Sequence, residues 1–176
     1  MPVIGVISDT HGLLRPEAVA ALEGSEIILH AGDVGDLAIL DALGRIAPVY
    51  AVYGNTDYGA VRSGLPRSVV VDLLAVDGRV GGAEPEGDGG GVQVLAYVHH
   101  GYRELDLAPG AAGTARVVSG HTHRPLVEER GGVLYLNPGS AGPRRFTLPV
   151  TVARVRLGGG EGGGGMQVEL VPLDVA

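Results

Sequence analysis

Residues 2–12, Pro-Val-Ile-Gly-Val-Ile-Ser-Asp-Thr-His-Gly, show the pattern that decides the fold, because a short apolar run ends directly in a cluster of polar residues. The same arrangement recurs four times along the chain. The apolar runs predict buried strands at residues 2–7, 27–29, 49–53, 92–98 and 116–118. The polar clusters that follow them are residues 8–12, 30–33, 54–57, 99–101 and 120–123. Because strand ends converge on one edge of a sheet, we expect these distant clusters to become neighbours.

The composition is typical of one compact domain spanning residues 1–176. A chain of 176 residues with 45% hydrophobic residues can bury one sizeable core. Two glycine-rich segments, 81–91 and 158–165, are expected to be connectors. The formal charge of −7, from 13 basic and 20 acidic residues, argues against a broad nucleic-acid-binding surface or an anionic membrane as partner.

The absence of cysteine restricts any metal to oxygen and nitrogen ligands, which favours hydrolytic over redox chemistry. The N-terminal residues form a strand pattern and do not read as a signal peptide, so a cytoplasmic location is expected. No apolar run approaches the roughly 20 residues that a bilayer crossing requires.

The order of elements predicts an α/β fold. In the first half, strands alternate with helices at residues 15–22 and 36–45, which is typical of parallel strands. The second half offers short strands that we expect to form a second, largely antiparallel sheet: residues 68–75, 92–98, 126–129, 133–136, 150–157 and 166–171. The expected architecture is two packed, mixed β-sheets flanked by helices.

Single clusters allow ordinary structural readings. Asp9 and His11 fit a capped turn, and Asp33 fits a helix cap. Asn55 after Gly54 is common turn chemistry, although its neutral carbonyl oxygen also suits a divalent cation. The imidazoles of His121 and His123, separated by one residue, favour metal binding more strongly. Only the combination of all five clusters makes a metal site the better interpretation.

The motifs Asp-x-His, Gly-Asp, Gly-Asn-x-Asp, His-Gly and Gly-His-Thr-His, in that order, resemble the calcineurin-like metallophosphoesterase superfamily. The small single-domain phosphodiesterase branch fits best, and the resemblance extends to residues 137–140. It implies an α-β-β-α sandwich that binds two divalent cations. Mn²⁺ is the expected metal, with Fe, Zn, Ni or Co as alternatives. It also implies two ligand sets that share a bridging Asp33: Asp9, His11, Asp33 and His123 for one ion, and Asp33, Asn55, His100 and His121 for the other.

The resemblance implies hydrolysis of a small phosphate ester by direct attack of a metal-bridging hydroxide, with Asp33, Asn55 and His100 as catalytic residues. His99 and His30 are expected to pack or to support the site, and Asp57 to orient a ligand. Two departures stand out: many relatives have histidine where this chain has Thr56 and Tyr102. Loss of a general acid there would cost about 10²–10⁴-fold in rate.

Two alternatives stay open. Thr56 and Tyr102 also suit a protein-binding scaffold on the same fold, similar to the retromer scaffold subunit. A phosphomonoesterase would share the metals, with Arg144 and Arg145 as a clamp for the terminal phosphate. The sequence leaves open whether the protein forms a homo-oligomer.

Overall fold

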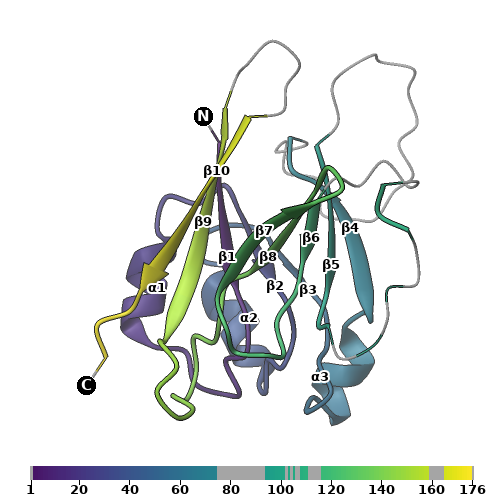
Figure 1. The fold of residues 1–176 in the computed structure, drawn as a ribbon. Helices are drawn as coiled ribbons and strands as arrows, with labels where there is room; N and C mark the ends of the chain where they lie inside the picture. The colour runs from purple at the N-terminus through teal and green to yellow at the C-terminus, as the bar shows by residue number, and fades with distance from the viewer. Residues whose placement is uncertain are drawn as a thin grey trace.

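Two five-stranded β-sheets face each other in the computed structural model, which describes residues 2–74, 94–101, 103, 105, 108–110, 116–158 and 165–175 (Figure 1). The first sheet has the strand order β10-β9-β1-β2-β3. Its parallel strands are β1 (Val3–Ile7), β2 (Ile27–His30) and β3 (Val49–Ala51). β9 (Thr151–Gly158) runs antiparallel to β1 and pairs with β10 (Gly165–Pro172).

The second sheet has the order β4-β5-β6-β8-β7 and is also mixed. The three central strands, β5 (Leu95–His99), β6 (Arg116–Val118) and β8 (Val133–Asn137), are parallel to one another. The edge strands β4 (Ser68–Asp72) and β7 (Leu126–Arg130) are antiparallel to β5 and β8. The prediction of two packed, mixed sheets is therefore confirmed.

The assignment of all second-half strands to one antiparallel sheet was wrong, because β9 and β10 complete the first sheet instead. One face of β9 is apolar and packs between the sheets through Ala153, Val155 and Leu157, whereas the other face carries Val152 together with Arg154 and Arg156. The apolar face of β9 extends the core between the sheets beside β1, with whose free side β9 pairs. The connector predicted at 158–165 joins these paired strands at Gly158 and Gly165, and the one at 81–91 lies outside the described residues.

Helices α1 (Pro16–Leu22), α2 (Leu37–Leu43) and α3 (Gly59–Gly64) all contribute to one apolar cluster with the outer face of the first sheet. Asp36 caps α2 by accepting a hydrogen bond from the backbone N–H of Ala38 at 2.9 Å. α3 was not predicted, because six residues bounded by glycines carry no helical period. Across the described ranges, no helix combines the length and the apolar character needed to cross a bilayer.

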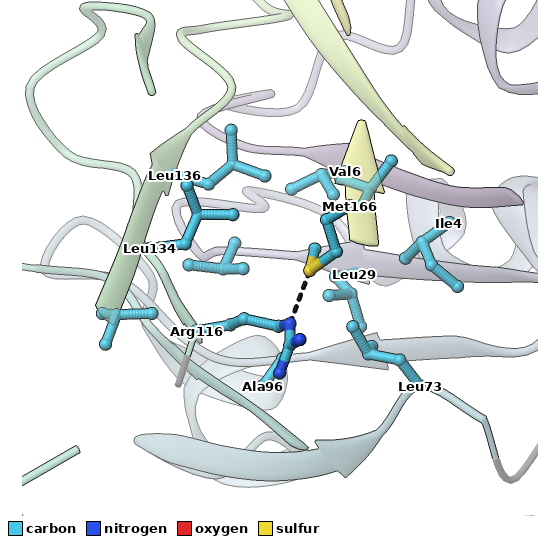
Figure 2. A pocket seen from close by; sticks show the side chains of 12 residues that line it. Ile4, Val6, Leu29, Leu73, Ala96, Arg116, Leu134, Leu136 and Met166 are labelled. Atoms are coloured by element: carbon cyan, nitrogen blue, oxygen red, sulfur yellow. Dashed lines mark hydrogen bonds between the residues drawn. The ribbon is translucent and has the colours of Figure 1, made fainter. Parts of the chain in front are cut away.

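The larger part of the core lies between the sheets, where side chains of β1, β2, β5 and β9 interdigitate. A small cavity remains there, lined almost entirely by aliphatic side chains (Figure 2). Arg116 reaches into this lining, and its Nε donates a hydrogen bond to Sδ of Met166. Burial lowers the pKa of Arg116, which indicates that the guanidinium is poorly solvated.

Candidate metal centre

The loops that follow β1, β2, β3, β5 and β6 meet at one edge of the two sheets and carry all the predicted ligands. In the described residues, six non-glycine residues have positive φ, and five of these are predicted ligands: Asp9 (54°), His11 (46°), Asp33 (51°), His121 (68°) and His123 (59°). The left-handed conformation is unfavourable for such residues and concentrates at functional sites. The strained backbone turns these side chains toward a common centre.

One group of donor atoms contains Asp9, His11 and His123. Nε2 of His123 lies 3.2 Å from Oδ1 of Asp9 and 3.2 Å from Nε2 of His11. Nε2 of His11 lies 3.8 Å from the same Asp9 oxygen. Three donor atoms from loops far apart in sequence therefore face one small volume.

A second group contains Asp9, Asp33 and His100. Nε2 of His100 lies 3.2 Å from Oδ2 of Asp33, and 3.1 Å from Oδ1 of Asn55. The same Asn55 oxygen lies 3.0 Å from Nδ1 of His121. All seven predicted ligands are thus brought together in two adjoining groups.

Both buried carboxylates lie between the two groups. Oδ2 of Asp33 is 3.8 Å from Nε2 of His11 and so faces both sets of imidazoles, as expected for a bridging ligand. Oδ1 of Asp9 is placed similarly, 4.0 Å from Nε2 of His100. The structure therefore offers Asp9 as well as Asp33 as a shared ligand, a role that the sequence did not indicate.

The residues present fit divalent cations. Oδ2 of Asp9 accepts hydrogen bonds from the Ser8 hydroxyl at 2.6 Å and the His121 backbone N–H at 3.0 Å. Its Oδ1 is buried and accepts no hydrogen bond from the described residues, although a buried carboxylate oxygen ordinarily has a partner. A mixed set of carboxylate, amide and imidazole donors suits Mn²⁺, Fe²⁺, Zn²⁺, Ni²⁺ or Co²⁺.

The hydrogen bonds of His100 prepare its Nε2 for a cation. Nδ1–H donates to the carbonyl oxygen of Ala31 at 2.7 Å, which leaves Nε2 as the ring nitrogen that faces the carboxylates. Burial lowers the pKa of His100, but the hydrogen bond that its ring donates to Asp33 and the charge of Asp9 outweigh burial and raise the pKa.

Asp33 shows the complementary effect. Burial raises its pKa, but the hydrogen bond and charge of His100, together with the Thr56 N–H, hold the pKa well below its usual value. Asp33 therefore stays ionised in its buried position.

Asp57 joins two of the ligand loops. Its buried carboxylate accepts backbone hydrogen bonds from Val34 at 3.1 Å, Gly35 at 2.8 Å and Gly54 at 2.8 Å. Asp57 was predicted to orient a ligand side chain. The structure instead shows that it holds the backbone on either side of the Asp33 and Asn55 positions.

Asn137 supports the turn that carries His121 and His123. Its Nδ2 donates to the carbonyl oxygen of Gly120 at 2.8 Å and to Oγ1 of Thr122 at 3.1 Å, while its Oδ1 accepts from the Gly139 N–H. No local pattern in the sequence indicated this contact, because Asn137 ends β8 whereas Gly120 and Thr122 lie in the loop after β6.

The remaining histidines lie away from the donor groups. His30 is fully buried: its Nδ1 accepts from the Gly32 N–H at 3.2 Å and its Nε2 contacts Oγ1 of Thr10 at 3.0 Å. Burial lowers the pKa of His30 to about 4, so the ring is neutral at pH 7. The ring of His99 packs near Tyr97, with centroids 5.4 Å apart. Both positions agree with the supporting or packing roles expected for them.

The sequence also drew attention to Thr56, Tyr102, Arg144 and Arg145, which are not proposed as metal ligands. Oγ1 of Thr56 is 3.4 Å from Nδ1 of His11, and Tyr102 lies outside the described residues. Arg144 turns away and donates to the carbonyl oxygen of Val175 at 3.1 Å. Burial lowers the pKa of His11 and outweighs the charges of Asp33 and Asp9, which raise it.

Comparisons with known proteins found similarity in sequence and in fold. A family model described as the calcineurin-like phosphoesterase superfamily domain matches residues 3–160. A probable metallophosphoesterase of Methanothermobacter thermautotrophicus is 39% identical over 161 residues, which cover 87% of this chain and 86% of that protein.

Two solved structures are similar in fold. One was reported as a novel archaeal phosphodiesterase, with a TM-score of 0.67, 22% identity, and coverage of 96% of this chain and 99% of the other. The other is Vps29 of Chaetomium thermophilum, with a TM-score of 0.67, 21% identity, and coverage of 97% of both chains.

Proposed function

This chain belongs to the calcineurin-like phosphoesterase superfamily, and from that premise we propose that it is a phosphodiesterase that uses two divalent cations. The observation that carries this proposal is the convergence of seven oxygen and nitrogen donors into two adjoining groups that share Asp9. The similarity in sequence to a probable metallophosphoesterase and in fold to an archaeal phosphodiesterase supports it.

One cation would be held by Asp9, His11, Asp33 and His123, and the other by Asp33, Asn55, His100 and His121. Mn²⁺ is the proposed metal, since it accepts both carboxylate and imidazole ligands. When bound, two such cations polarise the phosphoryl oxygens and activate a water molecule for in-line attack on phosphorus.

The chain's own residues create the conditions for that chemistry. Asp9 and Asp33 are 0% and 3% exposed, so little water competes for their charge, and electrostatic interactions are correspondingly strong. Asn55 contributes an uncharged oxygen, which preserves the cation's ability to withdraw electrons from the ester. With Thr56 after Asn55, this chain has no imidazole there to protonate a leaving group, which favours esters with good leaving groups.

The test measures hydrolysis of bis(p-nitrophenyl) phosphate and of p-nitrophenyl phosphate by metal-stripped protein titrated with Mn²⁺. We expect turnover to return with Mn²⁺ and to favour the diester. Asp33→Ala and His123→Ala should abolish Mn²⁺-dependent turnover, whereas Asp36→Ala, a carboxylate that only caps α2, should retain it. Full turnover in Asp33→Ala would refute the assignment, and a preference for the monoester would favour a phosphomonoesterase.

A protein-binding scaffold is the second candidate, since Vps29 has a similar fold. Exposed apolar side chains on and beside the edge strands, namely Val70, Leu74, Leu126 and Val127, would provide its contacts. Two bound cations per chain without any turnover of either ester would favour this alternative.

A further inference from the structure

The loops that carry the proposed ligands also expose large apolar side chains. Of the eight large hydrophobic residues exposed in the described ranges, three belong to these loops or to the loop after residue 140, namely Leu13, Tyr58 and Phe146, and Leu37 begins α2. The other four lie on or beside the edge strands β4 and β7. Single exposed apolar residues are ordinary, but a group of them around a polar centre indicates a binding surface.

Tyr58 forms part of a hollow that opens beside the candidate metal centre. The hollow has a volume of about 240 Å³ and is lined by His11, Gly35, Thr56, Asp57 and Tyr58. The Tyr58 side chain is 83% exposed, although the ring would be more stable if it were covered. One proposed ligand, His11, and one uncovered aromatic ring therefore line the same hollow.

The loop after residue 140 begins beside Asp9 and carries a second exposed aromatic ring. Its start is fixed by the Ser140 hydroxyl, which donates to the carbonyl oxygen of Asp9 at 3.0 Å, and by Nε of Arg15, which donates to Gly142 at 3.2 Å. Phe146, the only phenylalanine of the chain, is 92% exposed and has φ of 53°, a conformation that bulky residues rarely adopt.

We propose that the site selects phosphate esters whose organic group is a planar aromatic ring, with Tyr58 stacking on that ring. This inference rests on the proposed function, because it assumes that the phosphate lies at the metal ligands. A tyrosine ring offers a rigid apolar face, and stacked rings gain more than the burial of equal apolar area. An aliphatic group of the same size lacks that gain.

The experiment compares the binding of phenylphosphonate and cyclohexylphosphonate to the Mn²⁺-loaded protein by calorimetry. The two probes have the same charged group and similar size, neither can be hydrolysed to an alcohol and phosphate, and only the first is planar. We expect phenylphosphonate to bind about fivefold more tightly. Tyr58→Ala should remove this preference, and Tyr58→Phe should keep it. The matched control Leu74→Ala should also keep it, because Leu74 is exposed just beyond Asp72, which pairs with the start of β5, whereas the ligand loop follows the end of β5.

Equal affinities in the unmodified protein, or a preference that survives in Tyr58→Ala, would overturn the inference. The diester assay separates this result from the proposed function. A ring preference without turnover would uphold the binding inference and refute the phosphodiesterase, whereas turnover without a ring preference would do the reverse.

Discussion

Asp57→Asn is expected to loosen the candidate metal centre without touching any proposed ligand. The carboxylate of Asp57 accepts three backbone hydrogen bonds, from Val34, Gly35 and Gly54. An asparagine oxygen can keep the two that reach Oδ2, but they become bonds to a neutral acceptor and weaken by about 1 kcal/mol each. The amide N–H₂ then faces Gly35, whose bond is lost. The expected decrease in the free energy of unfolding is about 3–5 kcal/mol.

The assay is urea unfolding of the metal-free protein, followed by titration with Mn²⁺ monitored by electron paramagnetic resonance. Because Asp57 holds the backbone beside two ligand positions, we expect metal affinity to fall about 10–100-fold. Asp36→Ala is the control: it removes an exposed helix cap, costs about 1 kcal/mol, and should leave metal affinity unchanged. A change within about 0.5 kcal/mol in Asp57→Asn, with unchanged metal affinity, would refute the reasoning.

Three further predictions follow from buried groups. The pKa of His30 is about 4 when folded and near 6.5 when unfolded, so the folded state binds fewer protons between these values. The free energy of unfolding should therefore fall by about 3 kcal/mol as the pH drops from 6.5 to 4. His30→Gln should lose this part of the pH dependence. If the stability of the variant and of the unmodified protein changed with pH in the same way, the prediction would be contradicted. In Gly120→Ala, the new Cβ would overlap the Ser8 hydroxyl and come 2.7 Å from Oδ2 of Asp9, so we expect destabilisation of about 1–3 kcal/mol in thermal unfolding and weaker Mn²⁺ binding. Arg116→Met should raise the free energy of unfolding by about 1 kcal/mol in urea, because an apolar side chain suits the cavity lining better than a guanidinium; a loss of stability would show that the charge is needed.

Much of the framework was predictable from local patterns. Apolar runs ending in polar clusters predicted β1, β2, β3 and β6 closely. Asp36 and Gly44 are the N-cap and C-cap residues of α2 and lie at the two ends of the helix that the sequence predicted. These features depend on the backbone preferences and burial of neighbouring residues, which a sequence displays directly. The predicted ligands likewise follow from residue types at strand ends, and the structure brings all seven together.

The contacts between those elements were decided by tertiary packing. β9 and β10 satisfy the same strand pattern in either sheet, and only the free edge of β1 selects the first. His11 and His123 lie 112 residues apart, yet their Nε2 atoms approach to 3.2 Å.

The same distinction applies to individual side chains. The sequence alone determined that Asp9 and Asp33 end apolar strands, that His30 stands near them, and that Arg144 and Arg145 are adjacent. Only the folded chain decided that Asp9 faces both donor groups, that His30 is enclosed in the core, and that Arg144 turns away. The physical reason is that strand propensity and turn chemistry act over a few residues, whereas these side-chain positions result from the packing of two sheets whose strands come from the whole chain.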